Sequence, residues 1–261
     1  MHPHVIPNCE DFDDPTKFDE YNASFRKDLG FREDDLLIVQ PTRIVRRKRI
    51  EDSLELVHRL LQQYPDIRSR VHYIISLYQG DELDKNYVEE IQEIARQKDI
   101  PLHLIHDRVS SVRSQNEQGQ KIYTNRDVLA NADLITYLPI WEGFGNALLE
   151  TIALKKPLVT TTYLVYKTDI KVTGLEAVEI RDTYDDSGQL VIPDEALGQM
   201  HTLLTHPDRT RQMVERNFEI AKREFSFDTL ETKLRQVFAE YADEIRASRK
   251  RILKSKRSYS V

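Results

Sequence analysis

Two glutamates on either side of a glycine-containing turn form the part of the sequence best suited to chemistry. Glu142 and Glu150 are separated by seven residues in the segment EGFGNALLE, and a helix is predicted from about Asn146. Glycines let a backbone approach a ligand closely, and the free amides and positive dipole end of a helix attract an anion. The pattern therefore favours a phosphate-bearing ligand bordered by both carboxylates. The alternative is a plain structural connector between a strand and a helix.

The elements that would position this turn alternate along the chain. Short apolar runs predict strands at 35–41, 71–78, 102–106, 132–139, 157–161 and 177–180. Apolar residues at helical spacing, with their start and stop signals, predict helices at 15–29, 50–64, 87–98, 124–131, 146–154, 194–205, 208–224 and 228–246. A polar loop is expected over 108–120. The sequence thus predicts an α/β fold with one doubly wound parallel sheet, Rossmann-like, covered by helices on both faces. In such a sheet the ligand lies beyond the carboxyl ends of the strands, where the strand order reverses.

Composition excludes several other classes of protein. The 261 residues are 39% apolar, which is enough to build a core, so wholesale disorder is not expected. The net charge of −6 argues against a nucleic-acid binder that works through overall charge. The sequence contains no apolar run of the ~20 residues that a membrane helix needs, and Cys9 is the single cysteine. The eight histidines are scattered along the chain, so no metal is expected. These features predict a soluble, cytoplasmic protein.

Several motifs, in order, resemble the retaining glycosyltransferases of family 4, which have the GT-B fold. Glu142 and Glu150 match the EX7E signature of that family, followed by KPLVTT. The other matching segments are VIPNCEDFD (5–13), which resembles V-I-P-N-G-V-D, QPTRIVRRKRIEDSLELV (40–57), which resembles V-G-R-L-x-x-x-K-G-x-D, LANADLITYLPIWEGFG (129–145) and FSFDTL (225–230). The resemblance extends from about residue 5 to about residue 241. It implies that the chain is the C-terminal, nucleotide-sugar-binding half of a GT-B enzyme.

The resemblance also implies roles for individual residues. Arg43 and Lys48 would bind the diphosphate of the donor and stabilise it as a leaving group without a metal. Glu150 would accept hydrogen bonds from the ribose, and Glu142 would contact hydroxyls of the donor sugar. The remaining donor-binding positions are Gly143, Phe144, Gly145, Asn146 and Ala147 on the turn, and Val109 beside the nucleobase. The donor would be a UDP-, GDP- or ADP-linked sugar, with no separate cofactor.

Each assignment has a simpler alternative. The basic cluster at 43–49 could be a solvated loop, and that interpretation is preferred for Arg46, Arg47 and Arg49. Glu150 could be an exposed helix carboxylate. Tyr137 and Trp141 are interpreted as core residues, with an aromatic rim beside a sugar as the alternative.

Two departures from the family limit these expectations. The chain begins where the second GT-B domain begins, so an N-terminal acceptor-binding domain would belong to the full-length chain or to a separate chain. After the signature, TTTYLVYKTDIKVTG (160–174) has no glycine before Gly174, whereas the family has a Gly-Gly turn. The expected organisation is a lead-in over 1–34, the nucleotide-sugar-binding domain over 35–241, and a basic tail over 242–261. The tail is either a solvated end or a weak contact with the membrane surface.

The predicted function follows from these observations. The chain is expected to be the donor-binding domain of a hexosyltransferase that transfers a sugar to a hydroxyl acceptor, and to be inactive when isolated. The alternatives are a non-catalytic nucleotide-sugar-binding or regulatory module, and a GT-B relative that epimerises or hydrolyses nucleotide sugars.

Overall fold

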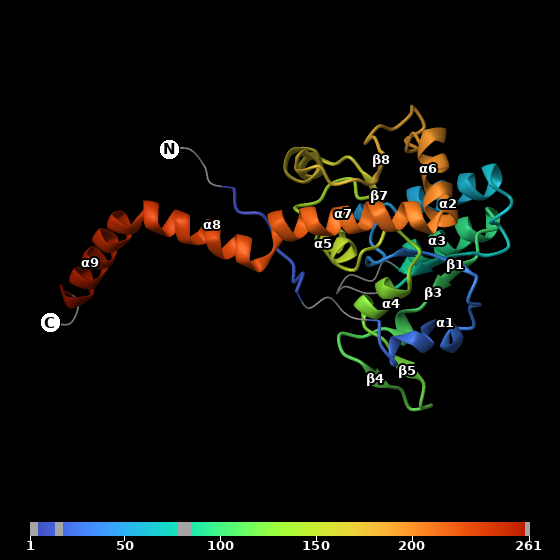
Figure 1. Cartoon of the computed structure of the whole chain (residues 1–261), viewed down its shortest axis with the longest axis horizontal. Coiled ribbons are helices and arrows are strands. Elements are labelled where there is room, and N and C mark those ends of the chain that lie inside the picture. The colour runs from blue at the N-terminus through green and yellow to red at the C-terminus, as the bar shows by residue number, and fades with distance from the viewer. Residues whose placement is uncertain (1–4, 14–17, 78–84, 259–261) are drawn as a thin grey trace.

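The computed structural model describes residues 5–13, 18–77 and 85–258 and contains one six-stranded parallel sheet (Figure 1). Its strands are β1 (Leu36–Gln40), β2 (Val71–Ile75), β3 (Leu102–Leu104), β6 (Leu134–Tyr137), β7 (Leu158–Thr161) and β8 (Val178–Ile180). The order across the sheet is β3-β2-β1-β6-β7-β8, and every pairing within it is parallel. The predicted α/β fold with a single doubly wound sheet is confirmed.

The strand order reverses between β1 and β6. The chain first moves outward from β1 through β2 to β3, then returns to place β6 on the other side of β1 and continues outward to β8. Ile38 of β1 pairs with Leu134 of β6 at this switch point. Two loops therefore diverge beyond the carboxyl ends of β1 and β6, and such a crevice is where doubly wound folds bind ligands.

Two separate apolar cores form because the strands are buried on both faces. Leu36 and Ile38 of β1 pack in the first core, whereas the alternate residues Leu37 and Val39 pack in the second. The first core is covered by α2 (Ile50–Gln63), α3 (Lys85–Gln97) and α6 (Asp194–Thr205). The second is covered by α1 (Phe25–Asp28), α4 (Asn125–Asn131), α5 (Asn146–Ala153) and α7 (Pro207–Phe225).

Several connecting segments differ from their predictions. The helix expected over 15–29 is only a 3-10 turn at Asn22–Ser24 followed by α1, with residues 14–17 outside the described part of the chain. The loop expected over 108–120 starts at the last residue of a 3-10 turn (His106–Arg108) and contains β4 (Ser114–Gln115), which pairs with β5 (Lys121–Ile122) in a small antiparallel hairpin. After β7 the chain forms a π-helical turn at Tyr166–Ile170 and a 3-10 turn at Lys171–Thr173. In each place, local polar residues form short elements that apolar periodicity does not reveal.

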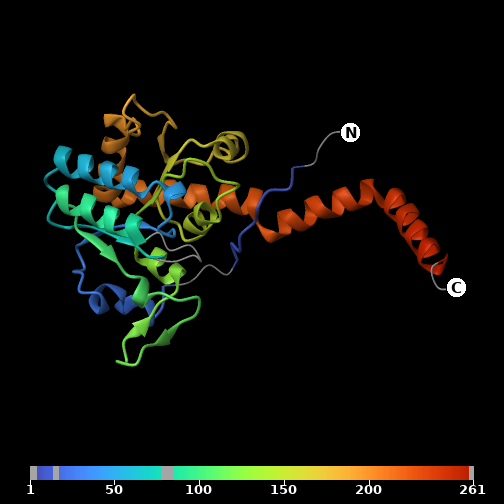
Figure 2. The ribbon, with the colours of Figure 1, turned by 180° about the vertical axis from the view of Figure 1, so that it is seen from behind.

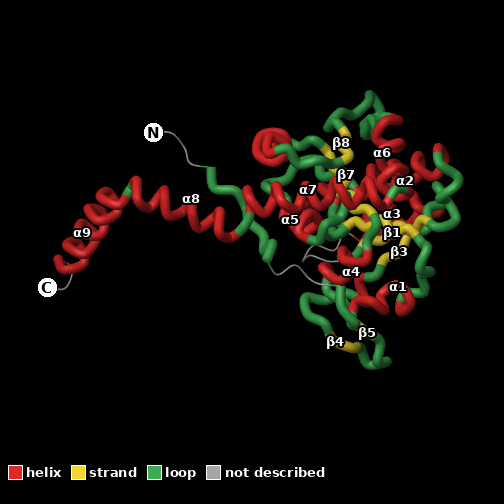
Figure 3. The backbone as a smooth tube through the Cα atoms, viewed as in Figure 1, coloured by secondary structure: helices red, strands yellow, loops and turns green. Residues whose placement is uncertain are grey.

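The C-terminal part of the chain leaves the body of the molecule. Instead of one helix over 228–246, there are two, α8 (Phe227–Glu240) and α9 (Ala242–Ser258), so the basic tail is largely helical (Figure 3). Figures 1 and 2 show both helices extending away from the sheet. Among the described helices, none is long and apolar enough to cross a membrane. Contact of the tail with a membrane surface stays a prediction.

A histidine pair on β2 and the edge strand β3 makes stability depend on pH. His72 Nδ1 lies 3.0 Å from His103 Nε2, and His72 Nε2 lies 3.2 Å from Asp35 Oδ2. Burial and the neighbouring His72 lower the pKa of His103 below its ordinary value, although Asp35 opposes them. The unfolded chain therefore takes up a proton at His103 before the folded chain does, and stability falls as pH drops below ~6.5.

We expect His103→Gln to reduce this acid sensitivity. One differential proton contributes a slope of at most ~1.4 kcal/mol per pH unit to the free energy of unfolding. Urea unfolding of the wild type and the variant at pH 7.5, 6.5 and 5.5 measures that slope. The exposed His206, replaced in the same way, is the control. An unchanged slope in His103→Gln would contradict the assignment.

Candidate functional site

A buried cluster of charge lies at the switch point of the sheet. Lys48 ends a 3-10 turn (Arg46–Lys48) after β1, and Glu142 lies in the loop after β6. Lys48 Nζ donates to Glu142 Oε2, and the same oxygen accepts from the Tyr137 hydroxyl at 2.8 Å and from Arg47 Nη1 at 3.1 Å. Lys48 Nζ also lies 3.3 Å from the Tyr137 oxygen. The fold thus brings together two of the predicted site residues from positions 94 residues apart.

The electrostatics of this cluster favour a charged pair. Burial by itself would raise the pKa of the Glu142 carboxyl, but hydrogen bonds from Lys48 and Tyr137 outweigh it and hold the pKa below its ordinary value. Burial lowers the pKa of Lys48, and Glu142 partly offsets that effect. Burial and the Glu142 charge raise the pKa of Tyr137, so its hydroxyl remains a donor. The cluster therefore presents a desolvated ammonium group beside an ionised carboxylate.

The N-terminus of α5 lies beside this pair. Gly145 precedes the helix with φ +93°, in the left-handed region, and no side chain caps the helix there. A Cβ at this position would lie 2.8 Å from the Tyr163 hydroxyl, which donates to the carbonyl oxygen of Phe144 at 2.9 Å. Glycine is thus needed both for the backbone angle and for the close packing. The first-turn amides, Asn146 and Ala147 among them, face outward from the helix end as potential donors to an anion.

Glu150 lies in the second turn of α5 among polar side chains. It is half-buried, so its interpretation as an exposed helix carboxylate is wrong. Burial and the nearby Glu10 raise the pKa of Glu150, whereas Arg126 and a hydrogen bond with Asn125 oppose that shift. Asn125 in turn accepts a hydrogen bond of 2.6 Å from Ser76, which follows β2. Glu150 and Asn125 can therefore present a carboxylate and an amide group to the hydroxyls of a ligand.

The lead-in segment contacts both the N-terminus of α5 and the polar side chains around Glu150. Asn8 Nδ2 donates to Asn146 Oδ1 over 2.6 Å, and Glu10 forms an ion pair with Arg126. The Glu10 amide also donates to the carbonyl oxygen of Phe225 at 2.9 Å, which ties the segment to the end of α7. Sequence reasoning missed Glu10, Asn125 and Arg126. The only signal was the match of residues 5–13 to a family motif.

The rest of the basic cluster has defined partners. Arg46 is exposed and forms a surface ion pair with Glu90 at 3.1 Å, which agrees with a solvated residue. Arg49 is half-buried and pairs with the buried Asp52 at 2.8 Å, so the solvated-loop interpretation is wrong for Arg49. Arg47 contacts Glu142 and lies 5.9 Å from the ring of Trp141. Arg43 is exposed and close enough to Lys48 to lower its pKa.

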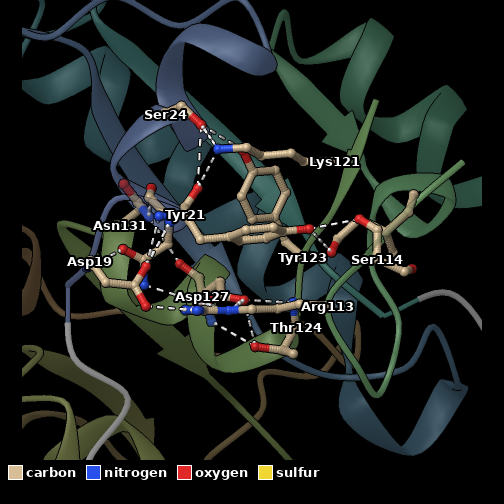
Figure 4. A network of polar contacts seen from close by, with 12 residues as sticks. Asp19, Tyr21, Ser24, Arg113, Ser114, Lys121, Tyr123, Thr124, Asp127 and Asn131 are labelled. Carbon is tan, nitrogen blue, oxygen red and sulfur yellow. Dashed lines mark hydrogen bonds and ion pairs between the residues drawn. The ribbon is translucent and has the colours of Figure 1, made fainter. Parts of the chain in front are cut away.

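The hairpin after β3 is anchored to the lead-in segment by Tyr21 (Figure 4). Arg113 and Lys121 both lie 4.8 Å from the centre of the Tyr21 ring. Arg113 pairs with Asp19 at 2.6 Å and with the buried Asp127 at 2.5 Å. The Tyr21 hydroxyl donates to backbone carbonyls of both hairpin strands, at 2.6 and 2.9 Å. The segment that leads from β3 to α4 is therefore firmly held.

The predicted nucleobase position lies at the base of this hairpin. Val109 forms an isolated parallel bridge with Tyr123 and is half-buried.

The fold brings Lys48, Glu142 and the α5 N-terminus together, with Arg43 at their margin. Glu150 lies farther along α5. Within the described residues, no group of three or more histidines, cysteines or carboxylates is placed to hold a metal ion.

Comparison with known proteins decides the family. Residues 22–171 match the family described as Glycosyl transferases group 1. The chain belongs to the group 1 glycosyltransferases. This chain is also similar to the mannosylglucosylglycerate synthase of Thermotoga maritima, with 35% identity over 240 residues that cover 87% of the chain and 54% of the relative. The enzyme of the same name from Petrotoga mobilis is 34% identical over 187 residues, covering 67% of the chain and 43% of the relative.

Solved structures support the fold of this glycosyltransferase chain. Anabaena HepE in complex with UDP superposes with a TM-score of 0.68 at 13% identity, covering 91% of this chain and 57% of that structure. At that identity the likeness concerns the fold, which is of the GT-B type. The chain spans about half the length of the curated relatives that it matches.

Proposed function

We propose that this chain is the donor-binding domain of a retaining glycosyltransferase of family 4, which transfers a hexose from a nucleoside-diphosphate sugar to a hydroxyl acceptor. The observation that carries the proposal is the convergence of Lys48 and the open N-terminus of α5 at the switch point of the sheet. A buried cation next to unpaired helix amides suits a diphosphate, and both groups act without a metal.

The leaving diphosphate gains negative charge as the bond to the sugar breaks. Lys48, Arg43 and the amides of Asn146 and Ala147 would stabilise that charge in the transition state more than in the ground state. The position of Lys48 is fixed before substrate binds, because Tyr137 and Glu142 hold it. This pre-organisation lowers the barrier without reorganisation at the moment of reaction.

Glu142 and Glu150 would divide the donor between them. Glu142 holds Lys48 through one carboxylate oxygen, so it would lie at the boundary between the diphosphate and the hexose. Within the part of the chain that the structure describes, its other oxygen accepts one long contact of 3.3 Å from the Gly143 amide, so it remains suited to sugar hydroxyls. Glu150, with Asn125 beside it, would accept hydrogen bonds from the ribose.

The acceptor-binding half of the enzyme would lie outside these residues. The relatives are about twice as long as the matched segment, which supports a further domain in the same polypeptide or a separate chain. The names of those relatives suggest an acceptor built on glycerate, and the UDP bound by HepE suggests a uridine-linked donor among the candidates. Two-substrate chemistry needs both partners aligned, a contribution of ~7–11 kcal/mol, so we expect no transfer by this chain alone.

Two substitutions test how the carboxylates divide the donor. Glu150→Gln should weaken nucleoside-diphosphate binding roughly ten- to a hundredfold, because a hydrogen bond to a charged group contributes ~1.5–3 kcal/mol. Glu142→Gln releases Lys48 from its partner, so it should leave diphosphate binding no weaker while weakening the nucleotide sugar. Calorimetric titration of both variants with UDP and UDP-glucose, and with the GDP and ADP pairs, measures these effects.

For each nucleotide, four affinities decide the outcome, namely those of the two variants for the diphosphate and for its sugar conjugate. If Glu142→Gln loses free diphosphate as severely as Glu150→Gln does, the two glutamates do not divide the donor in this way. Intact binding of every ligand by Glu150→Gln would likewise exclude its role at the ribose.

A further inference from the structure

A polar cavity lies beyond the carboxyl ends of β7 and β8. It has a volume of about 430 Å³, and it is lined by Thr162, Lys167, Lys171, Glu179, Arg181 and the neighbouring 182–183. The π-helical turn after β7 supplies Lys167, the following 3-10 turn supplies Lys171, and the loop after β8 supplies Arg181. This is the segment in which the sequence departs from the Gly-Gly turn of the family. None of the donor contacts described above involves it.

The cavity lies on the same side of the sheet as the Lys48–Glu142 pair. Tyr137 of β6 is in register with Thr160 of β7, which is in register with Glu179 of β8. In-register residues of parallel strands point to the same face, and neighbouring strands are ~4.8 Å apart, so Tyr137 and Glu179 are separated by about 10 Å.

A row of buried tyrosines connects the two places. The ring centres of Tyr137 and Tyr163 are 6.4 Å apart, and those of Tyr163 and Tyr166 are 5.9 Å apart. The Tyr166 hydroxyl then donates to Glu179 at 2.9 Å, and Glu179 also pairs with Lys171. The wall between the donor site and the cavity is therefore continuous and rigid.

Two of the cations in the cavity are not neutralised. Within the described residues, the side chains of Lys167 and Arg181 form no ion pair or hydrogen bond, whereas Lys171 is paired with Glu179. Both Lys167 and Arg181 are exposed. The one other acid of the lining, Asp182, influences Asp52 and Tyr184 on the far side of its loop. The cavity therefore presents two free positive charges to a ligand.

We propose that Lys167 and Arg181 bind the carboxylate of an anionic acceptor, next to the donor site. This inference rests on the proposed function, because it treats the cavity as a contact that this domain contributes to an acceptor bound mainly by the half of the enzyme outside these residues. An arginine fork beside a lysine suits a carboxylate, since the guanidinium donates two parallel hydrogen bonds and the ammonium adds charge. Tyr137, beside the proposed donor site, and Glu179, in the wall of the cavity, are about 10 Å apart, beyond the ~3 Å reach of a hydrogen bond, so the diphosphate and the carboxylate would occupy separate positions.

The test compares two small probes that differ only in charge. D-glycerate and glycerol share a three-carbon hydroxylated frame, and only the first carries a carboxylate. We expect D-glycerate, and not glycerol, to shift the backbone amide resonances of Thr162, Lys167 and Arg181 in the labelled chain. The double variant Lys167→Gln/Arg181→Gln should weaken glycerate binding at least tenfold. The charge-matched control Lys155→Gln/Arg235→Gln should stay within twofold of the wild type.

Further arms separate the possible outcomes. Equal shifts with glycerol, or unchanged glycerate binding by the double variant, would overturn the inference. Inorganic phosphate that binds here while glycerate does not would also overturn it, because the site would not then select a carboxylate. Titration with UDP, GDP and ADP distinguishes this inference from the proposed function. If the chain binds a diphosphate but not glycerate, only the inference about the cavity is wrong. If it binds glycerate but no diphosphate, only the proposed donor site is wrong.

Discussion

Gly145→Ala is expected to reduce nucleoside-diphosphate binding by about a hundredfold and to destabilise the fold. The backbone at Gly145 has φ +93°, which an L-residue adopts only with strain of ~1–3 kcal/mol. The new Cβ would lie 2.8 Å from the Tyr163 hydroxyl and 3.3 Å from the Tyr137 ring. Relief of that contact must move the turn or the tyrosines, and either movement misaligns the α5 amides. The loss of one charge-assisted hydrogen bond of ~1.5–3 kcal/mol accounts for the expected factor.

Gly143→Ala is the matched control for this variant. Gly143 lies two residues earlier in the same turn, outside the left-handed region, and an added Cβ would meet no atom within 4 Å. Thermal unfolding and calorimetry with diphosphates should show a Tm and an affinity close to those of the wild type. Equal behaviour of the two alanine variants would show that the α5 turn does not hold the diphosphate.

Lys48→Met should weaken diphosphate binding roughly ten- to a hundredfold, again through one charge-assisted hydrogen bond of ~1.5–3 kcal/mol. Methionine keeps most of the length of the side chain within the cluster and removes the charge together with the N–H donors of Lys48. Stability should fall less than affinity, because Glu142 keeps its contacts with Tyr137 and Arg47. Calorimetry of the folded variant measures the change in affinity, and urea unfolding in parallel measures the change in stability.

Arg46→Gln provides the control for Lys48→Met. It removes the same charge two residues away, but Arg46 pairs with Glu90 and lies over the ring of Tyr87, on the other side of the 3-10 turn. We expect its diphosphate affinity to stay within twofold of the wild type. A comparable loss in both variants would show that the basic cluster acts only through its summed charge.

The central strands β1, β6 and β7 were predictable because each is a short apolar run buried on both faces. All five residues of β1 are buried, and α6 has the bounds that its apolar spacing predicts, 194–205. The hairpin at β4 and β5 was not predictable, since its polar residues are held by Tyr21, whose hydroxyl bonds across 93 and 101 residues of sequence. Long-range contacts of this kind leave no local signal.

The candidate site, like the fold, was predictable from the sequence only in part. The turn before α5 could be found from its glycines and the spacing of the two glutamates. The ion pair between Lys48 and Glu142 depends on the reversal of strand order, which only the fold provides. Tyr137 is buried as expected, although its hydroxyl reaches the site. Trp141 is 64% exposed, so its interpretation as a core residue is wrong, because its loop extends beyond the sheet.

Calorimetric titration of the wild-type chain with UDP, GDP and ADP, in EDTA and in Mg²⁺, tests the central claim most directly. A site built from Lys48, Arg43 and helix amides neutralises the diphosphate by itself. At least one of the three nucleotides should therefore bind in EDTA, with an affinity that Mg²⁺ does not raise. The absence of binding by all three, or binding only in Mg²⁺, would contradict a metal-independent diphosphate site at the switch point of this sheet.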